Sequence, residues 1–236
     1  MESSTFKFAV ERFDPETGGE PRVQEYEMEV AEGTTVLEAL LRIQSEIDGT
    51  LAFRYACRGA VCGSCAMLVN GDVALACRTQ VHALGTSTIT VAPLPHLPVL
   101  KDLVVDLDPF FAKDLSVRPW LEPLEPAPER ERLVPPEEWG EAEPYTNCIL
   151  CASCHGVCPV PERDPEYLGP AALAKHYRFL ADPRDAADGE RLRLVSGEHG
   201  VDGCDTVWRC VRVCPKGVPP TKGILATRDR LSTENN

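Results

Sequence analysis

The arrangement of cysteines constrains this chain more than any other feature of its sequence. Its 236 residues include eleven cysteines, and all eleven fall into three closely spaced groups. Each group predicts a loop that turns several thiols inward, so a fold for this chain has to be built around three such loops. The groups are Cys57, Cys62, Cys65 and Cys77; Cys148, Cys151, Cys154 and Cys158; and Cys204, Cys210 and Cys214.

The first group has the spacing of a plant-type [2Fe-2S] site, C-x4-C-x2-C followed by a distant fourth cysteine. Gly59 and Gly63 lie within its loop, where they allow tight backbone turns and let N–H groups point at sulfur. We therefore expect Cys57, Cys62, Cys65 and Cys77 to bind a [2Fe-2S] cluster.

The second and third groups form an imperfect repeat. The second reads C-x2-C-x2-C-x3-C-P, the bacterial ferredoxin run, in which the fourth cysteine serves the other cluster of a pair. The third keeps the six-residue step between Cys204 and Cys210 and repeats the ending as Cys214-Pro215. Val207 stands where the repeat would place a counterpart of Cys151.

Exchanging the fourth ligands gives two predicted clusters. One has four thiolates and suits [4Fe-4S]. The other has three, because valine cannot donate to iron, and an incomplete cube of this kind is [3Fe-4S]. The predicted ligands are Cys148, Cys151, Cys154 and Cys214 for the first, and Cys158, Cys204 and Cys210 for the second.

Disulfides and zinc are the alternative uses of these thiols. We expect no disulfides, because the cysteine count is odd and no secretory leader is evident at Met1. Structural zinc is the stronger alternative, since C-x2-C pairs also build zinc ribbons. Zinc gives no reason for the two Cys-Pro endings or for a repeat that lacks a single ligand.

Composition limits the partners and the number of domains. The length suits two domains. The chain has 24 basic and 37 acidic residues, a net charge of -13, which argues against nucleic acid or anionic lipid as a partner. No apolar run is long enough to span a membrane. Reduced thiols would place the chain in a cytoplasm-like compartment.

The N-terminal part reads as a small sheet crossed by one helix, an α+β arrangement. Alternating apolar residues predict strands around residues 6–10 and 26–30, and a capping box at Thr35 and Glu38 begins a helix that runs to Gly49. A second hairpin at 66–76, turning at Asn70-Gly71, returns Cys77 to the cluster loop, and a further strand lies at 88–91. This order suits a β-grasp ferredoxin domain over residues 1–100.

For residues 101–236, the sequence predicts an all-helical, bacterial-ferredoxin-like domain. Apolar spacing indicates helices at 103–115, from Pro170 to before Pro183, at 186–194, and from Pro219 onward. Residues 119–144 hold seven prolines and eight glutamates, so we expect an extended connector there. The five histidines are expected to be ordinary polar residues, with His155 facing solvent.

The chain resembles the iron–sulfur subunit of succinate dehydrogenase and fumarate reductase, the respiratory complex II family, over nearly its whole length. Besides the cysteines, the resemblance includes Asp102-Leu103-Val104-Val105-Asp106, Cys148-Ile149-Leu150-Cys151, Tyr177-Arg178-Phe179-Leu180 and Cys214-Pro215-Lys216-Gly217.

Membership of this family implies an electron-transfer subunit of succinate:quinone oxidoreductase. Electrons would arrive from an FAD-containing subunit that oxidises succinate, pass through [2Fe-2S], [4Fe-4S] and [3Fe-4S], and leave to a quinone at membrane anchor subunits, some of which carry heme. The location implied is the cytoplasmic face of a prokaryotic inner membrane. Fumarate reduction and a soluble oxidoreductase without a quinone are the alternatives.

The quinone end departs from the ubiquinone-reducing members that this chain resembles. In those, aromatic residues follow the Cys-Pro of the second group, and a histidine follows the first cysteine of the third. Here Val160 follows Pro159, and Asp205 takes the place of the histidine. We therefore expect a different quinone, such as menaquinone, or a pocket supplied mainly by the anchors. The candidate residues from this chain are Pro159, Asp205 and Trp208.

Overall fold

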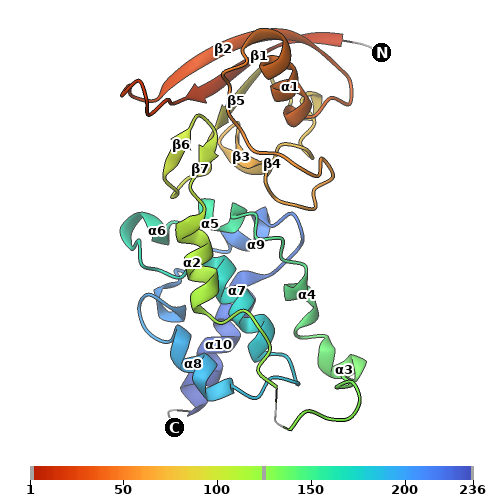
Figure 1. The fold of residues 1–236 in the computed structure, drawn as a ribbon, viewed down its shortest axis with the longest axis vertical. Coiled ribbons are helices and arrows are strands. Elements are labelled where there is room, and N and C mark those ends of the chain that lie inside the picture. Colours follow the sequence, from red (N-terminus) through yellow and green to blue (C-terminus); the bar gives the residue numbers. More distant parts are fainter. Residues whose placement is uncertain (1–2, 124–125, 235–236) are drawn as a thin grey trace. The chain divides into compact units, whose positions relative to one another are not determined.

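The computed structural model describes residues 3–123 and 126–234, which fold as two compact units. The first unit comprises Met1–Leu107 together with Cys151–Gly156, and the second comprises Asp108–Leu150 and Val157–Asn236. The short segment 151–156, which includes helix α5 (Ser153–Gly156), therefore belongs with the N-terminal residues, although it lies within the second cysteine group. Figure 1 shows the elements of both units.

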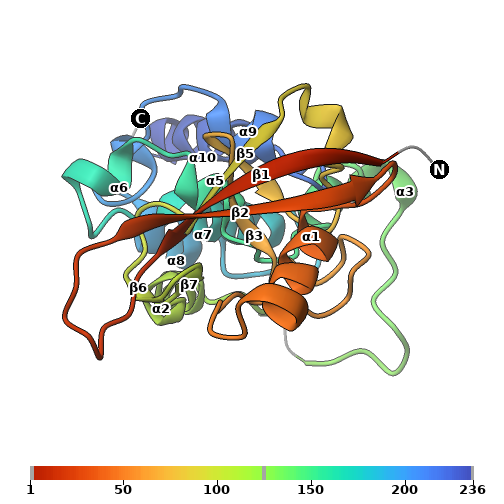
Figure 2. The same ribbon diagram turned by 90° about the horizontal axis from the view of Figure 1, so that it is seen from above.

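The first unit is built on a mixed five-stranded sheet in the order β2-β1-β5-β3-β4. The long antiparallel pair β1 (Ser3–Arg12) and β2 (Arg22–Ala31) is clear in Figure 2, and β5 (Thr88–Ala92) runs parallel to β1. Strands β3 (Ala66–Val69) and β4 (Asp72–Leu75) form the second hairpin. Both predicted hairpins and the later strand are confirmed.

A helix of the first unit also buries apolar side chains. Helix α1 (Val36–Arg42) begins at the predicted capping box: Thr35 accepts a hydrogen bond from the Glu38 N–H, and Glu38 accepts one from the Thr35 N–H. It continues as a π-helical turn, η1 (Ile43–Ile47). Leu37, Leu40 and Ile43 are fully buried, as are Phe8 and Val10 of β1. This buried face explains the helical spacing of the apolar residues.

The helix predicted at 103–115 begins later than expected, at Asp108. Val104–Val105 instead form strand β7, paired with β6 (Val99–Lys101), and α2 spans Asp108–Ser116. Asp102 explains the difference, because its backbone is left-handed, with φ of 48°, and its carboxylate accepts hydrogen bonds from Arg12 Nε and the Ala52 N–H. These tertiary bonds fix a turn at residues 102–103, after which Val104 and Val105 pair with β6 instead of starting the helix.

The second unit is helical, and α7 (Gly169–Leu180) is its central element. It packs against α2, α4 (Glu143–Thr146), α8 (Asp188–Val195) and α10 (Pro220–Glu234). Gly223 of α10 permits close approach, since a Cβ there would lie 2.9 Å from the Tyr177 ring. The shorter elements of the unit include α6 (Val160–Arg163), η3 (Val201–Gly203) and α9 (Arg209–Val213).

The expected connector contains little regular structure. Within its described residues, one short helix, α3 (Pro136–Trp139), interrupts it and α4 begins at its end. The fully buried Arg191 fixes the start of the connector. It donates hydrogen bonds to the carbonyls of Arg118 and Trp120 and pairs with Asp185. In the described residues, no helix is both long and apolar enough to cross a membrane.

Candidate metal centres

The first cysteine loop is arranged to donate backbone hydrogen bonds to sulfur. Cys57 Sγ accepts N–H groups from Gly59, Val61 and Cys62, at 3.4, 3.2 and 3.3 Å. Cys62 Sγ accepts the Cys57 N–H at 3.4 Å, and Cys65 Sγ accepts the Cys77 N–H at 3.5 Å. Such donors stabilise thiolates and the negative charge of an iron–sulfur cluster. The predicted [2Fe-2S] ligands therefore lie in surroundings that fit the group.

Left-handed backbone produces this arrangement. Arg58 and Ala60 both have φ of 55°, and Gly63 has φ of 75°. Non-glycine residues adopt this region at a cost, so the two neighbours of Gly59 store strain in the loop. The hydrogen bond from Ser64, followed by that from the Cys57 N–H, lowers the pKa of Cys62 to about 6, whereas burial raises the pKa of Cys65 to about 12.

Within the first unit, the first loop touches the segment that carries part of the second cysteine group. A Cβ on Gly63 would lie 2.6 Å from Cys151 Cβ and 2.9 Å from Cys151 Cα. Gly63 is therefore required twice, for its positive φ and for this close approach. The contact brings the backbone beside Cys62 and Cys65 against a predicted ligand of the next cluster.

The four predicted [4Fe-4S] ligands divide evenly between the units. Cys151 and Cys154 belong to the first unit, where Cys151 Sγ lies 3.3 Å from Ser153 Oγ. Cys148 and Cys214 belong to the second, where both pack against the apolar cluster that includes Tyr145 and Val218. That these four bind one cluster stays a prediction from their spacing.

The backbone reproduces the sequence repeat between the second and third groups. Cys151 lies between two left-handed residues, Leu150 and Ala152, with φ of 51° and 60°. Val207 lies between Thr206 and Trp208, with φ of 58° and 61°. Val207 thus has the same pair of left-handed neighbours as Cys151, and its side chain lacks only the donor sulfur.

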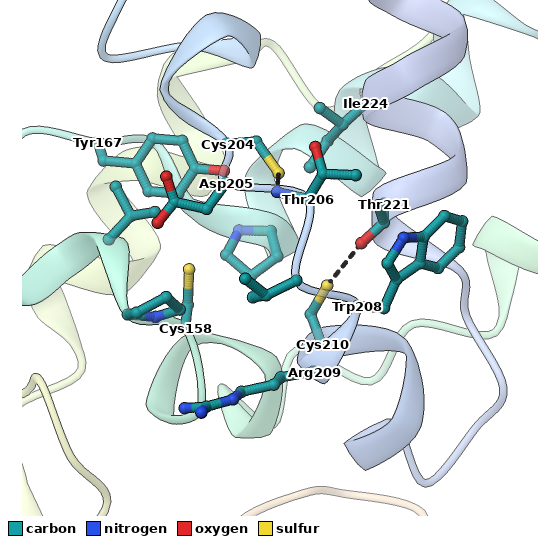
Figure 3. A pocket seen from close by; sticks show the side chains of 14 residues that line it. Cys158, Tyr167, Cys204, Asp205, Thr206, Trp208, Arg209, Cys210, Thr221 and Ile224 are labelled. Atoms are coloured by element: carbon teal, nitrogen blue, oxygen red, sulfur yellow. Dashed lines mark hydrogen bonds between the residues drawn. The ribbon is translucent and has the colours of Figure 1, made fainter.

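The three cysteines of the second predicted cluster line one pocket in the second unit, shown in Figure 3. They come from separate segments: Cys158 precedes α6, Cys204 follows η3, and Cys210 lies in α9. Besides these cysteines, its lining includes Pro159, Tyr167, Asp205, Val207, Trp208 and Thr221.

Each of the three sulfurs has hydrogen-bond donors beside it. Cys158 accepts the Val160 N–H, Cys204 accepts the Thr206 N–H at 3.4 Å, and Cys210 Sγ lies 3.1 Å from the Thr221 hydroxyl. Burial raises the pKa of Cys158 to about 11 and also raises that of Cys210. Burial favours the protonated thiol, and a bound metal can take the place of that proton. Buried cysteines with hydrogen-bond donors beside them therefore suit metal-bound thiolates.

The candidate quinone-proximal residues Pro159, Asp205 and Trp208 all line this same pocket. Asp205 is already engaged, since both of its oxygens accept hydrogen bonds from Arg163, at 2.6 and 2.7 Å. The Arg163 guanidinium holds the pKa of this carboxyl below its usual range. Trp208 is 36% exposed, in contrast to a core tryptophan.

Sequence reasoning missed three residues beside the pocket and misplaced one histidine. Arg163, Tyr167 and Thr221 belong to no cysteine motif, and Thr221 was expected only as part of a helix start. His155, expected to face solvent, is 3% exposed, and its Nε2 lies 3.3 Å from the His96 carbonyl oxygen. It is buried because α5 packs against β4.

None of the eleven cysteines, all of which lie in the described ranges, forms a disulfide. Among residues 3–123 and 126–234, no three His, Cys, Asp or Glu side chains group closely enough to hold a single metal ion.

Comparisons with known proteins agree with two iron–sulfur regions in this order. The family described as "2Fe-2S iron-sulfur cluster binding domain" matches residues 7–112, and "4Fe-4S dicluster domain" matches residues 144–218. The chain therefore carries a [2Fe-2S] domain followed by a [4Fe-4S] domain.

Similar proteins cover almost all of the chain. It is 40% identical to the succinate dehydrogenase iron–sulfur subunit of Paracoccus denitrificans, over 95% of this chain and 87% of that protein. It is 41% identical to the mitochondrial succinate dehydrogenase [ubiquinone] iron–sulfur subunit of Dictyostelium discoideum, over 92% and 79%. A chain of the Mycobacterium smegmatis Sdh1 complex in the apo form superimposes with a TM-score of 0.90 and 27% identity, covering 99% of this chain and 98% of that one. The chain belongs to the family of succinate dehydrogenase iron–sulfur subunits.

Proposed function

We propose that this chain is the electron-transfer subunit of a succinate:quinone oxidoreductase. It would receive electrons from a flavoprotein partner that oxidises succinate on FAD, and deliver them to a quinone at membrane anchor subunits. The observation that carries this proposal is the 40% identity to a succinate dehydrogenase iron–sulfur subunit over 95% of the chain, together with three cysteine groups that suit three clusters. The alternative is that the chain serves a fumarate reductase, which runs the reverse reaction.

We assign the ligands by group. Bound clusters would supply one-electron transfer, and the chain would hold them in place, donate hydrogen bonds to their sulfurs and exclude water. The assignment is Cys57, Cys62, Cys65 and Cys77 to [2Fe-2S]; Cys148, Cys151, Cys154 and Cys214 to [4Fe-4S]; and Cys158, Cys204 and Cys210 to [3Fe-4S].

The contact between Gly63 and Cys151 supports transfer from the first cluster to the second. Because their atoms are in van der Waals contact, the two ligand loops leave no room for water between them at this point. The N-terminal sheet would then be a β-grasp ferredoxin domain covering about residues 1–100, and residues 101–236 would form the ferredoxin-like helical domain.

For the electron acceptor, the residues at the third cluster support a quinone other than ubiquinone. Asp205 is bonded to Arg163 through both oxygens, so it does not offer the neutral hydrogen-bond donor that a histidine would. Trp208 and Pro159 supply apolar surface at the same pocket. A menaquinone ring, held mainly by the anchor subunits, fits this surface, and the subunit would sit peripherally on the cytoplasmic face of a prokaryotic inner membrane.

Copurification from detergent-solubilised membranes of the source cell tests this proposal. We expect a tagged chain to bring down a flavin-containing subunit and small membrane subunits, and the complex to reduce a naphthoquinone with succinate faster than it reduces a ubiquinone analogue. A matched Cys62→Ser variant should keep the partners but lose quinone reduction. Recovery of the chain without a flavoprotein would contradict the proposal, and a preference for ubiquinone would contradict its quinone assignment alone.

A further inference from the structure

Two buried hydroxyl groups lie against the sulfurs of the three-cysteine pocket. Thr221 Oγ1 lies 3.1 Å from Cys210 Sγ, and Tyr167 lines the same pocket as Cys204, where burial and then the neighbouring cysteine sulfurs raise the pKa of the Tyr167 hydroxyl. Both residues are 1% exposed. They come from different parts of the second unit, Thr221 from α10 and Tyr167 from the segment before α7, and Figure 3 shows both beside the cysteines.

The position of Thr221 in its helix explains why its hydroxyl reaches sulfur. Thr227, further along α10, bonds the carbonyl of Gly223 one turn earlier, as helical threonines commonly do. Thr221 is the second residue of α10, so the helix has no carbonyl one turn earlier for it to bond. Its backbone N–H also bonds Cys210, so one residue supplies two donors to one thiolate.

Hydroxyl donors act on a metal-bound thiolate through its charge. Reduction adds negative charge to the cluster and its sulfurs, so a hydrogen bond to sulfur is stronger in the reduced state than in the oxidised state. Burial increases the effect, because little water competes at Thr221 and Tyr167. Each hydroxyl should therefore favour the reduced cluster.

We propose that Thr221 and Tyr167 raise the reduction potential of the three-cysteine cluster by donating hydroxyl hydrogen bonds to its Cys210 and Cys204 ligands. The proposal rests on the function and ligand assignment given above. The couple concerned is a one-electron couple: the oxidised cluster gains one electron, and the donor loses one. No covalent bond forms or breaks, and both hydroxyl protons stay on their oxygens.

The test is a potentiometric titration of the purified complex, with dithionite as reductant and the EPR signal of the oxidised three-iron cluster as readout. Thr221→Val and Tyr167→Phe each remove one hydroxyl with little change in shape. We expect each to lower the midpoint potential of this cluster, and the double variant to lower it by about the sum, because the two bonds lie on different sulfurs. Thr221→Ser, which keeps the hydroxyl, should restore the wild-type potential.

Two matched variants control for general effects of these substitutions. Thr227→Val makes the same change on the same helix, and Tyr26→Phe removes a buried hydroxyl that bonds Asp48 in the first unit. Both should leave the three-iron potential unchanged, and the [2Fe-2S] potential should stay constant in every variant. An intact signal with an unshifted potential in Thr221→Val and Tyr167→Phe would overturn the proposal.

A different result would count against the proposed function itself. If the wild-type complex gave no three-iron signal at all, the ligand assignment would be wrong before the hydroxyls came into question. If Thr221→Val or Tyr167→Phe lost its cluster, the other variant would still test its own hydroxyl, and Thr221→Ala would replace Thr221→Val. An unshifted potential in the variants that keep the cluster would overturn the proposal.

Discussion

A single side chain, Val207, sets the number of ligands that the third cysteine group can offer. Its left-handed neighbours Thr206 and Trp208 match those of Cys151. This match is one of backbone geometry, so it supports the repeat by evidence other than the spacing of the cysteines in the sequence. The backbone of a four-ligand loop is thus present, and the side chain at its centre excludes the fourth bond.

Val207→Cys should therefore convert the three-iron site into a [4Fe-4S] site. A thiolate at this position would face the open corner of the cluster and allow one more iron atom to bind. We expect the oxidised three-iron EPR signal to disappear and the iron content per chain to rise by one. Val207→Ala, which offers no ligand, is the control and should keep the signal. A three-iron signal that persists in Val207→Cys would show that Val207 does not face the cluster.

At the residue scale, the ligand cysteines could be predicted because their spacing is local. Their hydrogen-bond partners could not be predicted. Cys158, Cys204 and Cys210 could be grouped from two short runs. Tyr167 and Thr221 reach the same pocket from segments that carry no cysteine. Nothing in a spacing pattern indicates which distant hydroxyl will lie at 3.1 Å from a sulfur.

Among the elements, hairpins and helices followed the sequence pattern where local and tertiary preferences agree. The capping box at Thr35 and the Asn70-Gly71 turn both appear as predicted. The helix expected from residue 103 does not start there, because Asp102 bonds Arg12 in a left-handed turn and the strand at Val104–Val105 follows. That bond joins residues ninety positions apart in the sequence, so no local pattern contains it.

Helix α7 carries a buried histidine that should make its unit sensitive to acid. His176 is fully buried, and its Nε2 bonds the Arg191 carbonyl. Burial, together with the charges of Arg191 and Arg230, lowers the pKa of His176 to about 4. The bonded Arg191 carbonyl and Asp185 act in the opposite direction but do not offset this. The unfolded chain binds this proton near pH 6.5. Stability is therefore lost as the pH falls from about 6.5 toward 4, by about 2 kcal/mol at pH 5.

Hydrogen exchange at the amides of α7 measures this effect. Between pH 7 and pH 5, after correction for intrinsic rates, the free energy of opening should fall by about that amount in the wild-type protein. His176→Gln keeps a donor for the Arg191 carbonyl but cannot take up a proton, so most of this pH dependence should vanish. Equal pH dependence in the two proteins would show that other groups are responsible.

At the scale of the whole molecule, the chain carries three cysteine groups on two folded units. The order of the groups and the family could be predicted from the sequence, because the spacings are specific and the chain retains them throughout. The division into units was less accessible, since residues 151–156 belong with the N-terminal sheet although they lie far along the chain. The domain boundary near residue 100 stays a prediction.

Low-temperature EPR of the purified complex, first oxidised and then reduced with succinate, tests the central claim most directly. The ligand assignment predicts a near-isotropic three-iron signal in the oxidised sample and a [2Fe-2S] signal that appears with succinate. A silent oxidised sample, with only [4Fe-4S] signals after chemical reduction, would contradict the assignment of Cys158, Cys204 and Cys210 and the role of the chain in succinate oxidation.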